Sequence, residues 1–321
     1  MSIRTRLTEL LAIEHPVLLA PMDLVADARL AVAVTKSGGL GLLGGGYGEE
    51  AWLTRELDAI GKTGARFGAG FITWSLARQP HLLEIVLERK PVAVMLSFGP
   101  PRPFVDRIKQ SGARAMCQVQ TVALAREAVE AGADILVAQG GEAGGHGISR
   151  GTMALVPEVI DAINDAVPVV AAGGIADGRG LAAALMLGAS GVMLGTRFYA
   201  TTEAAGYDAA KDRILRASGD DTARSIVFDI SRRNVWPSPF TGRCLRNTHL
   251  DRWLGREIEL LRNQEPESAR YAEARNSGDF ETAAVIAGEA SGLVHDLVPA
   301  RVVVERMMEQ AAQRLRGAPL A

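Results

Sequence analysis

Between residues 17 and 217 the chain alternates short apolar runs with longer amphipathic stretches. Eight such runs occur, and each is followed by a segment with helical periodicity. Short apolar runs without polar alternation are typical of parallel strands that are buried on both faces. Eight strand–helix units predict a closed (β/α)8 barrel, the TIM-barrel architecture, with strands at Val17–Ala20, Leu40–Leu43, Phe67–Phe71, Val92–Leu96, Ala115–Gln118, Asp134–Ala138, Val167–Ala172 and Gly191–Leu194.

Helix-boundary signals lie between these runs. Thr121 and Asp177 stand where N-cap residues are expected. Glycines also stand where helices should end in a left-handed residue, at Gly38, Gly112, Gly132 and Gly188. An open, doubly wound sheet is the competing architecture, but such sheets normally have fewer strands and carry their binding fingerprint after the first strand.

The segment Gly39–Gly44 matches the dinucleotide-binding pattern G-x-G-x-x-G letter for letter. That pattern requires glycines that follow a strand and open a helix, whereas here the intervening leucines form the predicted strand itself. We therefore do not interpret it as a dinucleotide site. The glycines at 44–46 allow two interpretations, a loop that closely approaches a ligand at the barrel mouth or a flexible turn.

The strand–helix alternation stops at about residue 217. The following residues include a proline-rich turn, Trp236–Pro239, and charged helical segments, but no further strand–helix unit. We expect residues 1–217 to form the barrel and residues 218–298 to form a smaller, mostly helical appendage or lid. A final helix at 299–316 is expected to return to the barrel.

Composition and charge exclude several classes of protein. The net charge is −2, which does not favour nucleic acid as a partner. Two cysteines, Cys117 and Cys244, give neither a disulfide framework nor metal-ligand spacing, so we expect no metal and a reducing, cytoplasmic environment. No apolar run reaches the roughly 18 residues that span a membrane. The N-terminal segment is interrupted by Glu9, Glu14 and His15 and does not resemble a signal peptide.

Glycines follow the last two predicted strands. Gly173 and Gly174 come after the seventh strand, and Gly195 and Thr196 come after the eighth. In (β/α)8 barrels these two loops commonly bind phosphate, because free N–H groups beside helix starts favour an anion. The sequence therefore predicts a phosphate site. Tight strand–helix packing is the alternative, and it explains one such loop more easily than both.

Other strand ends should lie at the same end of the barrel and meet the rest of a phosphorylated cofactor. Gln118 is polar at the end of a buried strand and needs a hydrogen-bond partner, either the cofactor or loop backbone. Met22 could instead belong to the core. The expected cofactor-facing residues are Ala20, Pro21, Met22, Phe71, Gln118, Gln139, Gly144 and Gly145, and substrate-facing residues are Trp74, Ser97 and Phe98.

One of the five histidines, His146, lies in a glycine-rich loop after the sixth strand, Ala138–Gly147. Glycine allows a backbone to approach a flat ligand closely. An imidazole suits proton transfer or stabilisation of a negative charge near neutral pH. We therefore interpret His146 as a catalytic residue, in contrast to the other four histidines.

These segments resemble the nitronate monooxygenase family, formerly called 2-nitropropane dioxygenases. The matching segments are Leu19–Met22, Phe71–Trp74, Leu96–Gly99, Ala138–His146, Val170–Gly178 and Leu194–Phe198, with a familiar pattern also at Gly288–Leu293.

The resemblance implies a barrel with non-covalent FMN, its phosphate on loops seven and eight and His146 facing the flavin. It implies oxidation of a nitronate by O2 to a carbonyl compound and nitrite. A nitronate is already an anion, so His146 is needed as a base only for a neutral nitroalkane. Otherwise it is equally well interpreted as a cation or hydrogen-bond donor to the nitro oxygens. Neither a membrane nor nucleic acid is expected as a partner, and a homo-oligomer is left open.

Two other functions stay open from sequence. The same superfamily contains flavin-dependent NAD(P)H reductases that act on enoyl-acyl-carrier proteins or quinones, although Gln139 and Ser97–Gly99 favour the monooxygenase. A non-enzymatic barrel that binds FMN or a phosphorylated metabolite is the other. A sugar-phosphate isomerase or lyase would need a lysine or carboxylate at a strand end, and Glu142 is the one acid nearby.

Overall fold

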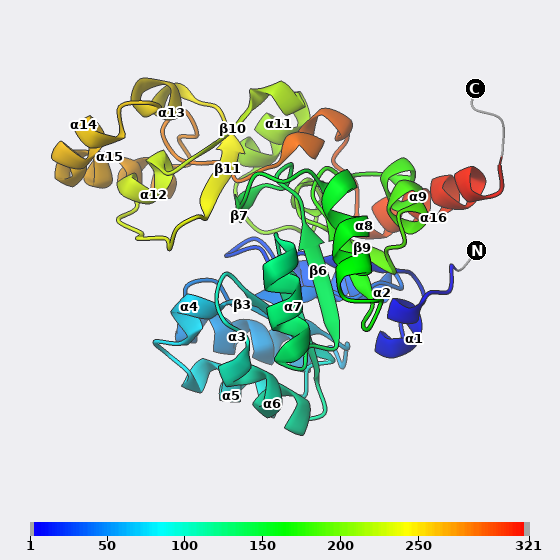
Figure 1. The fold of residues 1–321 in the computed structure, drawn as a ribbon. Helices are drawn as coiled ribbons and strands as arrows, with labels where there is room; N and C mark the ends of the chain where they lie inside the picture. Colours follow the sequence, from blue (N-terminus) through cyan, green and yellow to red (C-terminus); the bar gives the residue numbers. More distant parts are fainter. Residues whose placement is uncertain (1–2, 318–321) are drawn as a thin grey trace.

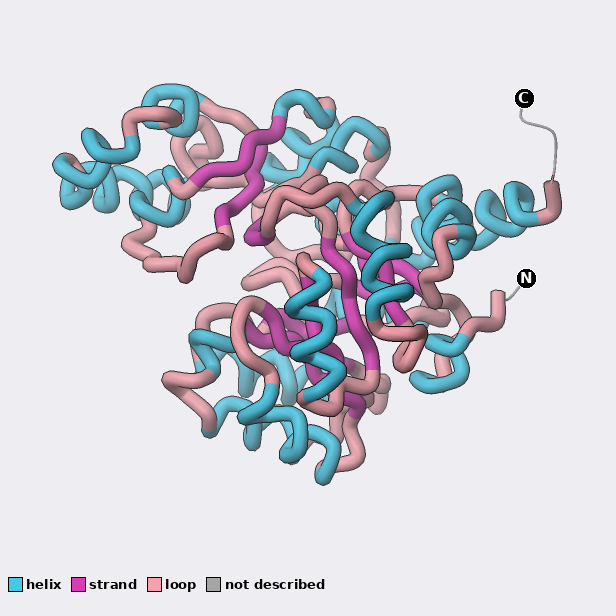
Figure 2. Tube along the Cα trace, viewed as in Figure 1, coloured by secondary structure: helices cyan, strands magenta, loops and turns pink. Residues whose placement is uncertain are grey.

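The computed structural model describes residues 3–317, and its core is a barrel of eight parallel strands (Figures 1 and 2). The strands run in the order β1-β9-β8-β6-β5-β4-β3-β2. Leu40, just before β2, closes the barrel against β1. Its N–H donates to Val17 O (3.1 Å), and its carbonyl accepts from Leu19 N (3.0 Å). The barrel prediction is confirmed, with strands β1 (Val17–Leu19), β2 (Leu42–Gly44), β3 (Gly68–Ile72), β4 (Ala93–Ser97), β5 (Arg114–Val119), β6 (Ile135–Gln139), β8 (Val169–Ala172) and β9 (Gly191–Leu194).

Helices follow the strands around the outside of the barrel. The predicted N-caps are present, since Thr121 accepts from Leu124 N and Asp177 accepts from Arg179 N. The four predicted helix-ending glycines have φ between 88° and 92°. The helices are α2 (Ala28–Lys36), α3 (Glu50–Gly61), α4 (Thr73–Leu76), α5 (His81–Glu88), α6 (Arg102–Gln110), α7 (Val122–Glu130), α8 (Thr152–Ala162), α9 (Gly178–Met186), α10 (Thr196–Tyr199) and α11 (Asp208–Arg216).

A short N-terminal helix, α1 (Arg6–Leu11), was not predicted, and it closes one end of the barrel. Leu7 and Leu11 are almost completely buried and belong to the same apolar cluster as the inward-facing strand residues Leu18 and Met193. Burial of a leucine side chain stabilises a fold by about 1.5–3 kcal/mol. Because α1 fills the end where the strands begin, an open cavity is left at the end where they finish.

Residues 218–298 contain two strands in addition to the predicted helices. β10 (Thr222–Ser225) pairs with β11 (Thr241–Leu245), and β11 pairs with a further strand, β7 (Gly145–Gly147), in the loop after β6. His146 lies opposite Gly242 in this antiparallel register. The remaining elements are η1 (Gly219–Asp221), α12 (Val227–Ser231), α13 (Thr248–Trp253), α14 (Glu257–Arg262), α15 (Gln264–Ser277) and η2 (Glu289–Leu293).

The last helix, α16 (Ala300–Leu315), lies beside α9 and α2 (Figure 1). The N–H of Gly178 at the start of α9 donates to Gln310 Oε1 of α16 at 3.1 Å. A Cβ at Gly178 would lie 2.4 Å from Met307 O, so only glycine allows the two helices to approach this closely. None of the helices within residues 3–317 is long and apolar enough to cross a membrane.

Candidate active site

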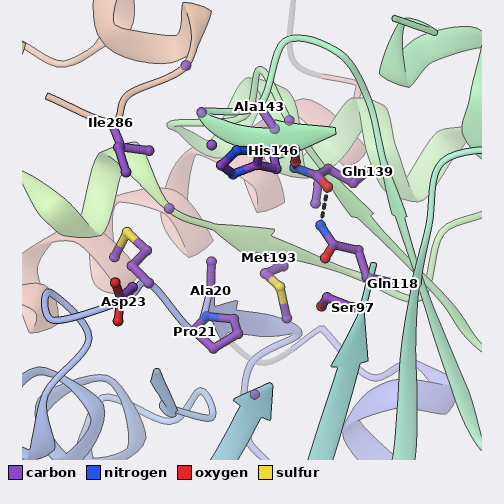
Figure 3. A pocket seen from close by; sticks show the side chains of 18 of the residues that line it. Ala20, Pro21, Asp23, Ser97, Gln118, Gln139, Ala143, His146, Met193 and Ile286 are labelled. Atoms are coloured by element: carbon purple, nitrogen blue, oxygen red, sulfur yellow. Dashed lines mark hydrogen bonds between the residues drawn. The ribbon is translucent and has the colours of Figure 1, made fainter. Parts of the chain in front are cut away.

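A cavity opens at the carboxyl ends of the barrel strands, and nearly all of the predicted site residues line it (Figure 3). The loops after six of the eight strands contribute to the wall, β3 and β5 contribute residues of the strands themselves, and residues 218–298 complete it. The predicted residues in the wall are Ala20, Pro21, Met22, Phe71, Ser97, Phe98, Gln118, Gln139, Gly144, Gly145, His146, Gly173, Gly174, Gly195 and Thr196.

Trp74 is the predicted residue that the structure does not place in the wall. Its ring packs edge-to-face against Trp236, with centroids 5.4 Å apart, and lies 6.0 Å from the ring of Tyr47. Trp236 and Tyr47 line the cavity. Trp74 therefore supports the wall from behind.

The loops after β8 and β9 form a cradle that suits an anion. The N–H groups of Gly173 and Gly174 donate no hydrogen bond to any residue within 3–317, and both glycines have left-handed φ, 103° and 72°. A Cβ at Gly173 would come within 3.0 Å of Gly140 O. Across the cradle, Thr196 Oγ1 accepts from Gly288 N (2.9 Å), which leaves its own hydrogen to donate. N–H and O–H donors of this kind fit a phosphate group.

Glu142, the acid that the sequence places near this cradle, is held by a neighbouring helix start. The carboxylate of Glu142 accepts from the N–H of Thr152 (2.9 and 3.0 Å) and from its hydroxyl (2.8 Å). Glu142 is therefore engaged in fixing the start of α8, and its charge is partly satisfied there.

The amide of Gln139 connects strand β5 to the histidine loop. Its oxygen accepts from Gln118 Nε2 (dashed in Figure 3) and from Gln120 Nε2 at 3.0 Å, and its own NH2 donates to His146 O at 3.1 Å. The partner that the sequence required for Gln118 is thus a neighbouring side chain, not loop backbone. This arrangement fixes the position of the His146 backbone.

Two arginines hold the glycine-rich loop in place. Arg224 of β10 donates to the carbonyls of Gly141 (3.1 Å), Ala143 (3.3 Å) and Thr241. Arg243 of β11 also donates to Gly141 O, at 2.9 Å. Burial lowers the pKa of the Arg224 guanidinium to about 10. A loop with so few side chains gains its defined conformation from these donors.

The imidazole of His146 has two neighbours from residues 218–298. Its Nε2 lies 2.9 Å from Asp229 Oδ2 and 3.1 Å from Oδ1, and its ring stacks on the indole of Trp236. Burial lowers the pKa of His146, and the hydrogen bond and charge of Asp229 oppose that shift without cancelling it. The positive charges of Arg232 and Arg224 lower it further. The neutral imidazole is therefore favoured.

The other sulfur and histidine candidates have structural surroundings. Burial raises the pKa of the Cys117 and Cys244 thiols to about 12, so neither is a ready nucleophile near neutral pH. His249 is buried, with Nε2 2.8 Å from Ser231 Oγ. Among residues 3–317 no group of three or more His, Cys, Asp or Glu side chains could hold a metal ion.

The family model described as nitronate monooxygenase matches residues 4–71 and 74–310. The chain belongs to the nitronate monooxygenase family. It is an oxidoreductase of a family that is generally flavin-dependent.

Relatives and solved structures agree with this assignment. The chain is 38% identical to the nitronate monooxygenase npaC of Metarhizium robertsii, over 92% of this chain and 90% of the relative. It superposes on FabK from Thermotoga maritima with a TM-score of 0.87 and 32% identity, covering 99% and 100% of the two chains. It superposes on the nitroalkane oxidase of Streptomyces ansochromogenes with a TM-score of 0.82 and 27% identity, covering 98% and 99%.

Several wall residues of this family member were not found by sequence reasoning. In the wall they are Asp23, Tyr47, Arg232, Trp236, Ile286 and Gly288. Behind the wall, Asp229 contacts His146 and Gln120 contacts Gln139. Two signals were available, the proline-rich turn that begins at Trp236 and the familiar pattern that begins at Gly288. Position in the chain was a third signal, because Asp23, Tyr47 and Gln120 lie beside Met22, the glycines at 44–46 and Gln118, which the sequence had singled out. Asp229, Arg232 and Ile286 follow no glycine motif and stand at no end of a barrel strand.

Proposed function

We propose that the protein binds FMN and oxidises alkyl nitronates with O2, giving carbonyl compounds and nitrite. The observation that supports this most directly is a single cavity lined both by the anion-suited loops and by His146. In a nitronate monooxygenase family member, that combination matches a phosphorylated flavin and an anionic substrate.

The chain's residues divide the task of holding FMN. The N–H groups of Gly173 and Gly174 and the hydroxyl of Thr196 would bind its phosphate. The amides of Gln118 and Gln139 would meet polar atoms of its ring system. Bound FMN supplies the electron acceptor that the protein side chains lack, and O2 reoxidises it.

The rest of the wall suits a small anionic substrate. Phe71, Phe98 and Trp236 give it an apolar surface that limits water. Arg232 lines the cavity with no ion pair to any described residue, and its guanidinium lies over the Tyr47 ring at 5.5 Å. A positive charge in a low-dielectric cavity attracts a nitronate. His146 would donate to, or accept a proton from, the nitro-bearing end of the substrate.

Residues 218–298 would act as a lid over this site. This proposal is supported by Arg232, Trp236 and Ile286, which bring side chains from that segment into the cavity wall. It is also supported by the pairing of β11 with β7, which connects the segment directly to the histidine loop.

A reductase is the second candidate function. The similarity to FabK, an enoyl reductase, favours it, because that chain is matched along its full length. A reductase would reduce bound flavin with NADH or NADPH, whereas a monooxygenase would reduce it with a nitronate.

Anaerobic mixing separates the two functions. The FMN-loaded protein is mixed with propionate 3-nitronate, an alkyl nitronate, NADH or NADPH, and bleaching of the flavin absorption is followed. We expect rapid bleaching by nitronates and slow bleaching by the nicotinamides. The reverse order would favour the reductase, and a protein that never becomes yellow with FMN would contradict both.

Replacement of the histidine tests its role. We expect His146→Ala to keep FMN and to lower turnover of the best nitronate by about 10²–10⁴-fold. His81→Ala, on the exposed end of α5, is the matched control and should keep full activity. Unchanged turnover in His146→Ala would exclude a catalytic role.

A further inference from the structure

His146 and Asp229 are brought together from distant parts of the chain. His146 lies on β7, whereas Asp229 lies on α12, 83 residues later in the chain. Both carboxylate oxygens lie within 3.1 Å of Nε2, and the two side chains are only 9% and 7% exposed. We infer that Asp229 is a positioning residue that keeps a proton on His146 Nε2 and leaves Nδ1 as the atom that accepts a proton from substrate.

The chemistry of the pair gives the direction of this hydrogen bond. An ionised carboxylate can only accept, so the Nε2 facing it must carry hydrogen. In a neutral imidazole the lone pair is then on Nδ1. Nδ1 makes no hydrogen bond to a residue within 3–317. It is not one of the fully buried atoms that lack a partner, so part of its surface is exposed. Because His146 lines the cavity, Nδ1 is accessible from there.

The surroundings prevent the ring from presenting its other nitrogen. The indole of Trp236 lies parallel to the imidazole, which fixes the plane of the ring. Gln139 fixes the His146 carbonyl at 3.1 Å. A flip about the Cβ–Cγ bond would break the bonds to Asp229 and place its buried carboxylate against a nitrogen lone pair. Such an unpaired buried charge is costly.

The charges around the ring favour the neutral base. Asp229 is the acid that faces it, and Arg232, directly after α12, and Arg224 of β10 are the bases nearby. Burial, Arg232 and Arg224 together lower the pKa of His146 despite Asp229. The imidazole is thus able to accept a proton near neutral pH, and Asp229 stabilises the imidazolium that results.

This inference rests on the proposed function and narrows it toward neutral nitroalkanes. With a nitroalkane, Nδ1 would remove the proton on the carbon beside the nitro group. The C–H bond breaks, an N–H bond forms, and the electron pair moves onto the nitro oxygens to give the nitronate. A nitronate supplied from outside needs no such step. Loss of the Asp229 carboxylate should therefore lower kcat/KM for nitroalkanes far more than kcat/KM for nitronates.

The test compares Asp229→Asn with the wild-type holoenzyme. We expect kcat/KM for a nitroalkane to fall by about 10²–10⁴-fold, and kcat/KM for its nitronate to fall by less than about tenfold. Asp229→Glu should restore part of the nitroalkane activity. Asp251→Asn, an exposed carboxylate on α13, is the matched control and should change neither rate.

A second readout reports the proton position without turnover. In protein labelled with ¹⁵N-histidine, with the His146 signals assigned by His146→Gln, the wild type should show Nε2 protonated and Nδ1 bare at pH 8. Asp229→Asn should shift the proton toward Nδ1.

A wild-type spectrum with the proton on Nδ1 would overturn the inference. Equal losses of kcat/KM on both substrates, together with an unchanged spectrum in Asp229→Asn, would also overturn it. If neither substrate reacts, the proposed function fails, but the spectra still decide the role of Asp229. If Asp229→Asn does not fold, the wild-type spectrum and Asp229→Glu decide it.

Discussion

The imidazole of His146 and the indole of Trp236 lie face to face, with ring centroids 3.4 Å apart and planes 6° apart. The indole is itself fixed, because its Nε1–H donates to the hydroxyl of Tyr47 at 3.0 Å. One face of the histidine is therefore covered by a residue of the proline-rich turn. This contact links the proposed lid to the chemistry of the site.

Removal of the indole should change the titration of His146. In Trp236→Leu we expect the pKa of His146 to rise toward 6.5, because burial is the largest cause of its depression. The acid limb of the pH profile of kcat/KM should then move to higher pH, and kcat/KM should fall by about tenfold, near the upper energy of an aromatic pair. Trp236→Phe should behave nearly as the wild type, and an unshifted acid limb in Trp236→Leu would refute this account.

Gly195 offers a clean test of the phosphate cradle. A Cβ there would meet Met22 Sδ at 3.7 Å and Ala20 Cβ at 3.8 Å, which are ordinary contacts. Gly195→Val should therefore fold but lose FMN affinity by about tenfold or more, since the side chain would occupy space needed by the ligand. FMN titration by fluorescence, with the melting temperature beside it, measures both effects.

Gly178 is the matched control for that substitution. Its Cβ would clash with α16 at 2.4 Å, away from the cavity. Gly178→Val should lower stability by about 1–3 kcal/mol through overpacking and leave FMN affinity in the folded fraction nearly unchanged. If both variants lost FMN only in proportion to lost stability, the cradle would not be where the phosphate binds.

Arg224 should contribute strongly to the stability of the glycine-rich loop. Arg224→Met would remove the side-chain donor of the Ala143 carbonyl and leave Gly141 O with Arg243 alone, and we expect it to lower the free energy of unfolding by about 2–4 kcal/mol. Urea unfolding provides the measurement. Arg314→Met, on the exposed face of α16, is the control and should change stability by less than about 0.5 kcal/mol. A similarly small effect of Arg224→Met would contradict the role of Arg224 in holding the glycine-rich loop.

Stability should also fall as the solution becomes acidic. Burial lowers the pKa of His15, His146 and His249 below 6.5 in the folded state. As the pH falls, these histidines therefore bind protons at a higher pH in the unfolded chain than in the folded protein. The contribution of the neutral histidines to the free energy of unfolding is complete above pH 6.5 and is lost as the pH falls through their folded-state pKa values. Asp23 and Asp27, whose pKa burial raises, act in the opposite sense.

Comparison with His249→Gln isolates one of these contributions. Glutamine can keep the hydrogen bond to Ser231 without titrating in this range. Urea unfolding at pH 7.5 and pH 5.5 should show a smaller loss of stability in His249→Gln than in the wild type. Equal losses in the two proteins would mean that His249 does not titrate with folding.

Local patterns in the sequence were sufficient for the barrel and for most of its mouth. Parallel strands all end at the same edge of a closed sheet, so glycines that follow β8 and β9 had to lie near the residues that follow the other strands. The N-caps at Thr121 and Asp177 depend on hydrogen bonds to residues two or three positions away. Such short-range relationships can be read from sequence.

Tertiary structure alone decided what surrounds His146. Its loop sequence, Gly–His–Gly, has no apolar alternation, and it becomes β7 only because β11 lies beside it. Asp229 and Trp236 come from a segment without strand–helix repeats, more than 80 residues away in the chain. The sequence by itself was sufficient to predict the barrel, the places of its glycine loops and the position of His146 in one of them. The hydrogen-bonded and stacked neighbours of that histidine depend on long-range packing, which no local periodicity encodes.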